Sequence, residues 1–369
     1  MTRSPLALAA LATVAVPGLD VYDVRRPTRP GTDLDRAVVI DAAGTRWVVR
    51  APLRPAAGAA LEAELALLEH MAEHADSGTL PFDVPRPAGF AHLPEGGRAV
   101  VHREVPGRPV RLDVLAGGPG LAAEIGRALA ALHELPVSVA DAAGVPSYDA
   151  RAYRERRLAE VDDAARTGKV PPLLLRRWER MLEDVSIWRF QPTLTHGDLN
   201  AGHVLTDGAR VTGILDWGEA KVADPADDLS WLLVAAPTDA VDSICEAYQL
   251  RRTELKDPHL TTRALLAGEL ALARWLLYGV RAGDAEIVAD AESMLADLAE
   301  HVFEDESALD PEPVVETPAD DEGRADSSAW GAGDAADGVA DGVADEQADE
   351  QADEQADEAS DDVEGREAS

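Results

Sequence analysis

Alternating apolar and polar residues predict a small β-sheet near the start of the chain. Residues 37–40 and 47–50 are rich in strand-forming side chains and are joined by turn-forming residues, a pattern typical of a β-hairpin. Residues 59–74 instead place leucines and a methionine at helical spacing, and residues 98–104 return to a strand-forming composition before a Pro-Gly pair. The pattern therefore predicts a lobe of two strands, a helix and a third strand.

From residue 112 onward the apolar pattern becomes mostly helical. A short β segment with a turn at residues 207–208 interrupts it between residues 193 and 217. We expect helices over residues 121–134, 150–165, 173–184, 229–233, 238–251, 261–282 and 284–303. The fold class that follows is α+β, with a small β-rich lobe over residues 1–106 and a larger, mainly helical lobe over residues 107–303.

Residues 304–369 have a different composition from the rest of the chain. They contain short repeats, such as two copies of DGVA, and almost no large apolar side chains. Residues 301–369 hold 25 acidic residues against two arginines, a net charge of −23. A segment with so little apolar surface and so much charge does not offset the entropy lost on folding. We therefore predict a disordered acidic tail, either a solvated appendage or an interaction arm.

Charge and cysteine content narrow the class of protein. Residues 1–300 still carry a net charge of −12, which disfavours binding of nucleic acid through a basic face. The single cysteine, Cys245, forms no internal disulfide and suggests a reducing, cytoplasmic compartment. No apolar run reaches 18 residues, so we expect no membrane span. The apolar residues 6–16 are either a short signal peptide or a buried first helix, and the lack of a cleavage site favours the helix.

The strongest candidate chemistry lies between residues 195 and 231. Asp198, His203 and Asp216 fall within one loop–strand–turn–strand segment, and His196 precedes Asp198 by two residues. Two carboxylates and an imidazole placed so closely suggest a metal site or a proton-transfer site. Each residue taken alone could simply belong to a turn or a strand end. Their order and spacing together carry the prediction.

This order resembles the catalytic core of the aminoglycoside phosphotransferase superfamily, the small-molecule kinases related to protein kinases. That pattern is His-x-Asp, a metal ligand five residues after the Asp, and a second metal-binding Asp on the next strand. Most members have Asn where this chain has His203. The run HGDLNAGHVL followed by DWGEAKVADPADD is similar to the macrolide 2′-phosphotransferases, as are residues 46–52, 126–136 and 175–188. The resemblance covers about residues 5–303 and implies a bilobal, protein-kinase-like fold.

The resemblance also implies roles for the residues of this segment. Asp198 would accept the proton of the attacking substrate hydroxyl, and Asp216 and His203 would hold Mg²⁺. Because imidazole is a poorer Mg²⁺ ligand than an amide oxygen, His203 could act through a water molecule. His196 and Asp228 would support the catalytic loop rather than take part in the chemistry.

Nucleotide binding is expected to use the small lobe. No lysine precedes Lys169, so Arg50 would take the place of the strand lysine that contacts nucleotide phosphates in kinases. Its acidic partner would be Glu64, with Glu62 as the alternative. The backbone groups of Arg103 and Val105, after the third strand, would contact the purine of ATP or GTP, and the sequence leaves both nucleotides open.

The acceptor implied by the resemblance is a macrolide antibiotic, phosphorylated on the 2′-hydroxyl of its cationic amino sugar. Glu219 could approach that cation or could face solvent. Another small hydroxylated substrate, such as an aminoglycoside, a sugar or an amino alcohol, is an alternative. A nucleotide-binding pseudokinase is a third, although such a protein has no chemical need for both Asp198 and Asp216. We expect a monomer that binds small molecules and neither nucleic acid nor membrane.

Overall fold

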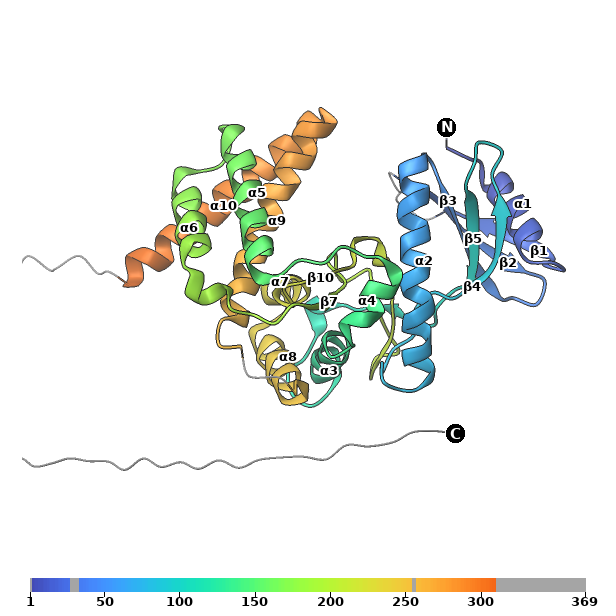
Figure 1. The fold of residues 1–369 in the computed structure, drawn as a ribbon, viewed down its shortest axis with the longest axis horizontal. Coiled ribbons are helices and arrows are strands. Elements are labelled where there is room, and N and C mark those ends of the chain that lie inside the picture. The colour runs from blue at the N-terminus through green and yellow to red at the C-terminus, as the bar shows by residue number, and fades with distance from the viewer. Residues whose placement is uncertain (1, 27–32, 254–256, 310–369) are drawn as a thin grey trace, which may run out of the picture. The chain divides into compact units, whose positions relative to one another are not determined.

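The computed structural model describes residues 2–26, 33–253 and 257–309. They form a β-rich lobe followed by a helical lobe, as the sequence predicts (Figure 1). The first lobe contains α1 (Pro5–Ala15), β1 (Val21–Arg25), β2 (Leu34–Asp41), β3 (Arg46–Pro52), α2 (Pro55–Asp76), β4 (Pro87–His92) and β5 (Arg98–Arg103).

The sheet of the first lobe has five antiparallel strands in the order β1-β2-β3-β5-β4. The predicted hairpin is β2 and β3, with Val38 opposite Val48, and the predicted third strand is β5. Strands β1 and β4 were not predicted from the sequence. The β4 segment begins with proline and contains Gly89, residues that are depleted in strands and are tolerated at a sheet edge.

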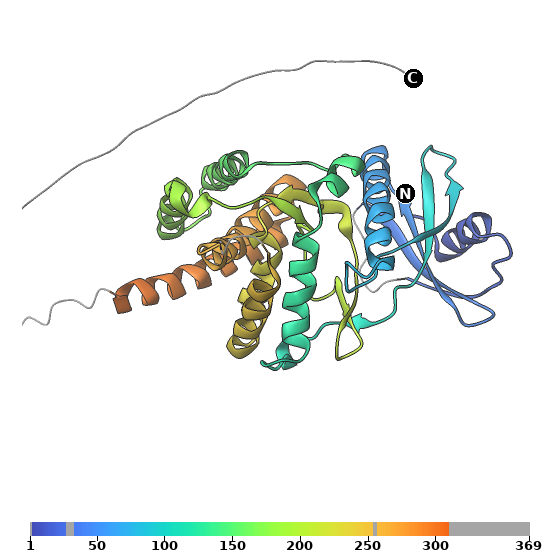
Figure 2. The ribbon, with the colours of Figure 1, turned by 60° about the horizontal axis from the view of Figure 1, so that its bottom comes forward.

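Two helices cover the opposite faces of this sheet, α1 on one side and α2 on the other (Figures 1 and 2). Leu8, Ala9 and Ala12 of α1 are buried against sheet residues such as Val39 and Val49. The apolar run near the N-terminus is therefore a packed helix, in agreement with the interpretation that the sequence favoured. Within the described residues, no helix has the length and apolar character needed to cross a bilayer.

The second lobe is built from helices around short strand pairs. Its elements are β6 (Arg108–Pro109), α3 (Leu121–His133), α4 (Val137–Ala143), α5 (Ala150–Arg166), α6 (Pro172–Glu183), β7 (Thr193–Thr195), β8 (Val204–Thr206), β9 (Val211–Ile214), β10 (Lys221–Ala223), α7 (Ala226–Ala235), α8 (Thr238–Arg251), α9 (Leu260–Ala282) and α10 (Ala285–Leu309). The predicted helices correspond to these elements, except that α4 was missed.

The short strands hold the segment that carries the candidate chemistry. β7 pairs with β10, and β6, β8 and β9 form a three-stranded sheet. The chain between β7 and β8 carries Asp198 and His203, and Asp216 follows β9 after one intervening residue. The pairing of these strands therefore brings the two stretches of the candidate site next to each other.

The predicted start of the acidic tail falls inside α10. This helix continues from residue 303 to Leu309, and Val302 is buried in the helical lobe. The tail prediction is therefore wrong for residues 304–309, because the helix that packs on α9 extends through them. The rest of the predicted disordered segment, from residue 310 to 369, lies outside the described residues.

Candidate active site

The loop that carries Asp198 is held by the carboxylate of Asp228, in the first turn of α7. The backbone N–H of His196 donates to Asp228 Oδ2 at 2.7 Å, and that of Gly197 donates to Oδ1 at 2.8 Å. Gly197 has a φ of 81°, and a Cβ there would lie 2.4 Å from the carbonyl oxygen of Glu219. A glycine therefore permits both the turn and the close approach of the two backbone segments.

Asp228 also belongs to a buried chain of side chains that the sequence did not reveal. His133 Nε2 lies 3.2 Å from Asp228 Oδ2, and His133 Nδ1 lies 2.8 Å from the hydroxyl of Tyr248. Burial alone would raise the pKa of Asp228, but the hydrogen bond with His133 and the backbone donors hold that pKa below its ordinary value. The loop that carries Asp198 is thus attached through one carboxylate to α3 and α8.

His196 links the loop to the strand end before Asp216. Its Nε2 lies 2.8 Å from the carbonyl oxygen of Leu215, and its Nδ1 accepts from the N–H of Asp198 at 3.3 Å. The ring is fully buried, 4.7 Å from the Trp217 ring centroid. Burial lowers the pKa of His196, so the imidazole is neutral and holds two parts of the site in register.

Asp216 and His203 meet on the side of the loop that faces the first lobe. His203 Nε2 lies 3.4 Å from Asp216 Oδ2, and His203 Nδ1 lies 2.8 Å from the carbonyl oxygen of Asp198. Burial would raise the pKa of Asp216, yet hydrogen bonds from His203 and Arg36 hold that pKa well below its usual range. Of the non-glycine residues that the structure describes, Asp216 alone has a positive φ, 65°.

Asp216 and His203 can supply only part of the ligands of a magnesium ion. They suit an ion whose other ligands come from a nucleotide. Over the described ranges, no group of three or more His, Cys, Asp or Glu side chains could hold a metal ion. Mg²⁺ commonly uses one or two carboxylates and takes its other ligands from phosphates and water. The hard oxygens of Asp216, with His203 beside them, suit that arrangement.

Arg50 and Glu64 form a buried ion pair between β3 and α2. Arg50 Nη1 and Nη2 donate to Glu64 Oε1 and Oε2, both at 2.6 Å, and the two side chains are 6% and 2% exposed. Arg50 Nη2 also lies 3.8 Å from Asp216 Oδ1. The alternative partner, Glu62, pairs instead with Arg98 on the exposed side of α2.

The chain segment between the lobes borders a cavity of about 260 Å³. Val105, His102 and Val48 line it, together with Leu205 and Leu215 of the second lobe. The Arg103 carbonyl accepts a hydrogen bond from His102 Nδ1 at 2.8 Å. The apolar walls of this cavity suit a purine ring. Arg103, the other residue predicted to contact the purine, is the last residue of β5 and does not line the cavity.

A second cavity, of about 300 Å³, adjoins the first at Arg36, Arg50 and Asp216. It also includes Glu64, His203 and Asp198. The two cavities together connect Val105, one of the two predicted purine contacts, with the predicted phosphate contact Arg50 and the predicted metal ligands. The path that they form ends at Asp198.

A third and larger cavity, of about 870 Å³, begins on the other side of Asp198. Tyr148, Trp231 and Tyr278 give it aromatic walls. Its charged residues are Arg156, Arg157, Glu160, Asp198, Glu219, Lys221, Asp227 and Arg274. Sequence reasoning missed most of this lining, because the residues come from four distant parts of the chain and share no spacing.

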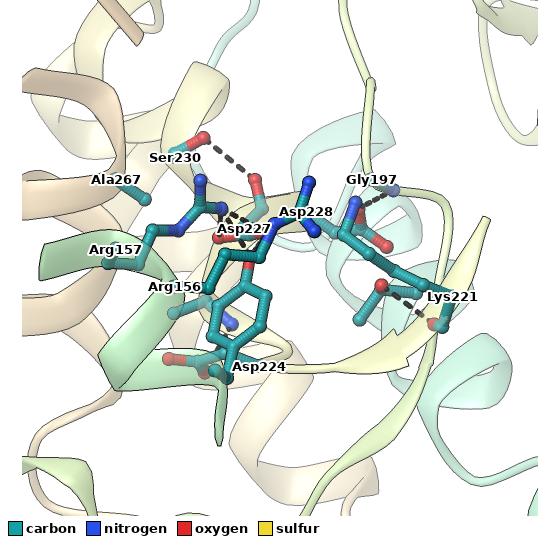
Figure 3. A network of polar contacts seen from close by, with 12 residues as sticks. Arg156, Arg157, Gly197, Lys221, Asp224, Asp227, Asp228, Ser230 and Ala267 are labelled. Atoms are coloured by element: carbon teal, nitrogen blue, oxygen red, sulfur yellow. Dashed lines mark hydrogen bonds and ion pairs between the residues drawn. The ribbon is translucent and has the colours of Figure 1, made fainter. Parts of the chain in front are cut away.

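Asp227 is the centre of the polar contacts in the large cavity. Arg157 Nη2 donates to Asp227 Oδ2 at 2.8 Å (Figure 3). The hydroxyl of Tyr153 donates to the same oxygen. Lys221 extends toward Gly197, and its Nζ donates to the Glu219 carbonyl at 3.2 Å. The arginines on one side of the large cavity are therefore paired with Glu160 and Asp227, and Asp198 and Glu219 add two more acidic groups to the lining.

Comparison with known sequences finds a family match and a relative that is similar over a short segment. The profile of the phosphotransferase enzyme family matches residues 25–265. The uncharacterized protein YcbJ of Bacillus subtilis strain 168 is 38% identical over 101 residues, which is 27% of this chain. The chain spans 33% of the length of that relative.

Comparison with solved structures finds kinases of antibiotics. The macrolide 2′-phosphotransferase MphH from Brachybacterium faecium has a TM-score of 0.66 and 27% identity, covering 79% of this chain and 98% of its own. A type I macrolide 2′-phosphotransferase has a TM-score of 0.67 and 27% identity, covering 80% and 98%. The GDP complex of aminoglycoside 2′-phosphotransferase-IIIa has a TM-score of 0.67 and 22% identity, covering 82% and 100%, and shows the same fold.

Proposed function

Because the chain belongs to the phosphotransferase enzyme family, we propose that it transfers the γ-phosphate of GTP or ATP to a macrolide antibiotic. The acceptor would be the 2′-hydroxyl of the amino sugar, and its phosphorylation would inactivate the antibiotic. One observation carries the proposal: Asp198 lies on the wall of both the 300 Å³ cavity and the 870 Å³ cavity. A base at that boundary can serve a hydroxyl that enters from one side and a phosphate that enters from the other.

The proposed transfer depends mainly on alignment and on neutralisation of charge. Asp198 would accept the proton of the sugar hydroxyl while the hydroxyl oxygen attacks the γ-phosphorus. Arg50, held in place by Glu64, would contact the nucleotide phosphates. Asp216 and His203 would hold the Mg²⁺ ion, which when bound neutralises negative charge on the phosphate oxygens.

The walls of the large cavity support a macrolide as the acceptor. Its four cationic side chains are matched by four acidic ones, and its arginines pair with Glu160 and Asp227, so the formal charge of the lining is zero. A macrolide carries one ammonium, next to the reacting hydroxyl, where Asp198 and Glu219 would attract it. Aromatic walls and a volume of about 870 Å³ also suit a large, mostly apolar ring.

The similarity to two solved macrolide 2′-phosphotransferases supports the same acceptor class, since both are matched over 98% of their length. Another hydroxylated small molecule is the alternative acceptor. The pseudokinase alternative is less favoured, because Asp198 and Asp216 are both present and both border the predicted phosphate path. We further propose that the enzyme acts as a monomer in the cytoplasm, where GTP and ATP are available.

The test is phosphorylation of erythromycin and kanamycin by the purified protein with GTP or ATP and Mg²⁺. We expect a mass increase of one phosphate on erythromycin alone, and no product with Asp198→Ala. Loss of a positioned base should lower turnover by about 10²–10⁴-fold while nucleotide affinity stays near that of the wild type. Asp162→Ala, which alters an exposed aspartate on α5, is the matched control and should retain full activity.

Each other outcome points to a different function. Phosphorylation of kanamycin would contradict the acceptor assignment. Nucleotide turnover without modification of either antibiotic would shift the substrate to another small hydroxylated molecule. Absence of nucleotide binding would favour a role without catalysis.

A further inference from the structure

Arg36 of β2 forms a bidentate ion pair with Asp216. Its Nη1 donates to Asp216 Oδ2 at 2.7 Å, and its Nη2 donates to Oδ1 at 2.6 Å. The contact joins the β-rich lobe to the helical lobe over a separation of 180 residues. Both carboxylate oxygens of the proposed metal ligand are therefore bonded to an arginine.

Arg36 is also placed to meet a ligand. It lines the 260 Å³ cavity of the predicted purine site and the 300 Å³ cavity that ends at Asp198. In the part of the chain that the structure describes, the buried Nε atoms of Arg36 and of Arg50 have no hydrogen-bond partner. Arg50 is directly opposite Arg36 in the pairing of β2 with β3. Two buried donors on neighbouring strands thus lack an acceptor at the place where phosphates are expected.

Binding of a metal to Asp216 is incompatible with the ion pair as it stands. A cation that takes either oxygen of Asp216 meets the positive charge of Arg36 at the same carboxylate. The nucleotide phosphates, which would arrive with the metal, offer Arg36 new anionic acceptors. Guanidinium binds phosphate oxygens with the same two-pronged geometry that it uses for a carboxylate.

We propose that Arg36 is a second phosphate-binding residue that covers Asp216 until nucleotide binds. In the nucleotide-free protein it occupies the carboxylate and opposes binding of a metal ion alone. When a metal–nucleotide complex enters, Arg36 exchanges the carboxylate for phosphate oxygens, and Asp216 becomes available to the metal. This inference rests on the proposed nucleotide-dependent function. It adds that the protein binds the metal–nucleotide complex in preference to the free metal ion.

Arg36→Gln tests this exchange, because it should strengthen binding of a metal ion alone and weaken binding of a metal–nucleotide complex. Binding of Mn²⁺ alone, followed by electron paramagnetic resonance of the free ion, should tighten about fivefold, the effect of losing a partly exposed ion pair. Binding of non-hydrolysable GTP and ATP analogues with Mg²⁺, followed by calorimetry, should weaken about tenfold, as expected for a lost charge-assisted hydrogen bond.

Arg98→Gln is the matched control, since Arg98 makes a similar bidentate pair with Glu62 on the same lobe but lines neither cavity. It should leave both affinities unchanged. If Arg36→Gln weakens both affinities, or changes neither, the exchange is refuted. If the wild type binds neither analogue, the proposed function fails and this inference fails with it.

A second variant covers the case in which Arg36→Gln does not fold. Arg36→Lys keeps the positive charge but cannot cover both oxygens of Asp216, because an ammonium lacks the planar fork of a guanidinium. It should bind Mn²⁺ more tightly than the wild type. An unchanged Mn²⁺ affinity in a folded Arg36→Lys protein overturns the proposal.

Discussion

Burial, together with partners that are distant in sequence, sets the protonation state of single residues at the site. His102 is an example, because it is 5% exposed at the end of β5, beside the predicted purine cavity. Burial lowers the pKa of His102 to about 4. The folded protein therefore holds a neutral imidazole at a pH where an unfolded chain would begin to bind a proton.

We expect His102 to make the protein less stable in mild acid. The imidazole of the unfolded chain binds a proton below about pH 6.5, whereas that of the folded chain does so near pH 4. The unfolded state thus binds more protons between these values, and the free energy of unfolding should fall by about 3 kcal/mol across this window as the pH drops. In urea unfolding, the free energy of unfolding of His102→Gln should change less with pH than that of the wild type.

His92→Gln is the control, since His92 is exposed on β4. It should keep the wild-type dependence on pH. An equal dependence in His102→Gln and the wild type would show that other groups cause the loss of stability in acid.

Sequence could predict those site residues whose spacing is local. Asp198, His203 and Asp216 fall within 19 residues of one another, so their order alone indicates the site. Arg36 and His133 reach the same site from 180 and 95 residues away, through contacts with Asp216 and Asp228. No periodicity in the sequence reports such a contact, because it depends on how the lobes and helices pack.

At the scale of elements, the pair of Arg50 and Glu64 connects β3 to α2. Both side chains are buried, so the loss of one partner leaves an uncompensated charge in a poorly solvated place. Glu64→Ala should lower the free energy of unfolding by about 3 kcal/mol and should weaken nucleotide binding, because Arg50 loses its fixed orientation. Chemical denaturation and calorimetry measure the two effects.

Glu62→Ala provides the comparison on the same helix. Its partner Arg98 and Glu62 itself are 37% and 45% exposed, and a pair of that kind contributes at most about 1 kcal/mol. Equal destabilisation by the two variants would contradict the structural importance given to Glu64.

One element that sequence missed, β4, consists of residues with weak strand preferences of their own. β4 contains Pro87 and Gly89, and Gly89 is needed because a Cβ would lie 1.8 Å from the carbonyl oxygen of Ala15. The pairing of β4 with β5, rather than its composition, makes it a strand. The hairpin of β2 and β3 was predictable because its alternation of side chains is intrinsic to the segment.

At the scale of the whole molecule, the acidic residues from 310 onward should be dispensable for turnover. A protein that ends at Leu309 keeps all of α10, and its turnover number should stay within about twofold of the wild type if the rest is a solvated segment of low hydrophobicity. Steady-state kinetics of the shortened protein measure this. A large loss would mean that the acidic segment contributes to the site.

A deeper truncation separates the tail from the helix. A protein that ends at residue 295 lacks Val302, which is buried in the helical lobe. We expect it to unfold at a lower temperature than the protein that ends at Leu309. Equal thermal stability would show that the last turns of α10 do not support the lobe.

The residues that line the large cavity all lie between positions 146 and 278, in the helical lobe. The proposed purine and phosphate cavities use β2, β3, α2 and the segment after β5, and beyond that segment they use only residues between 198 and 219 of the helical lobe. Acceptor range can therefore change during evolution without a change in nucleotide choice, and a chimera that exchanges residues 146–160 and 220–278 should inherit the first trait without the second. A competitive inhibitor shaped for the large cavity would likewise have no need to imitate a nucleotide, which would spare the other kinases of the host.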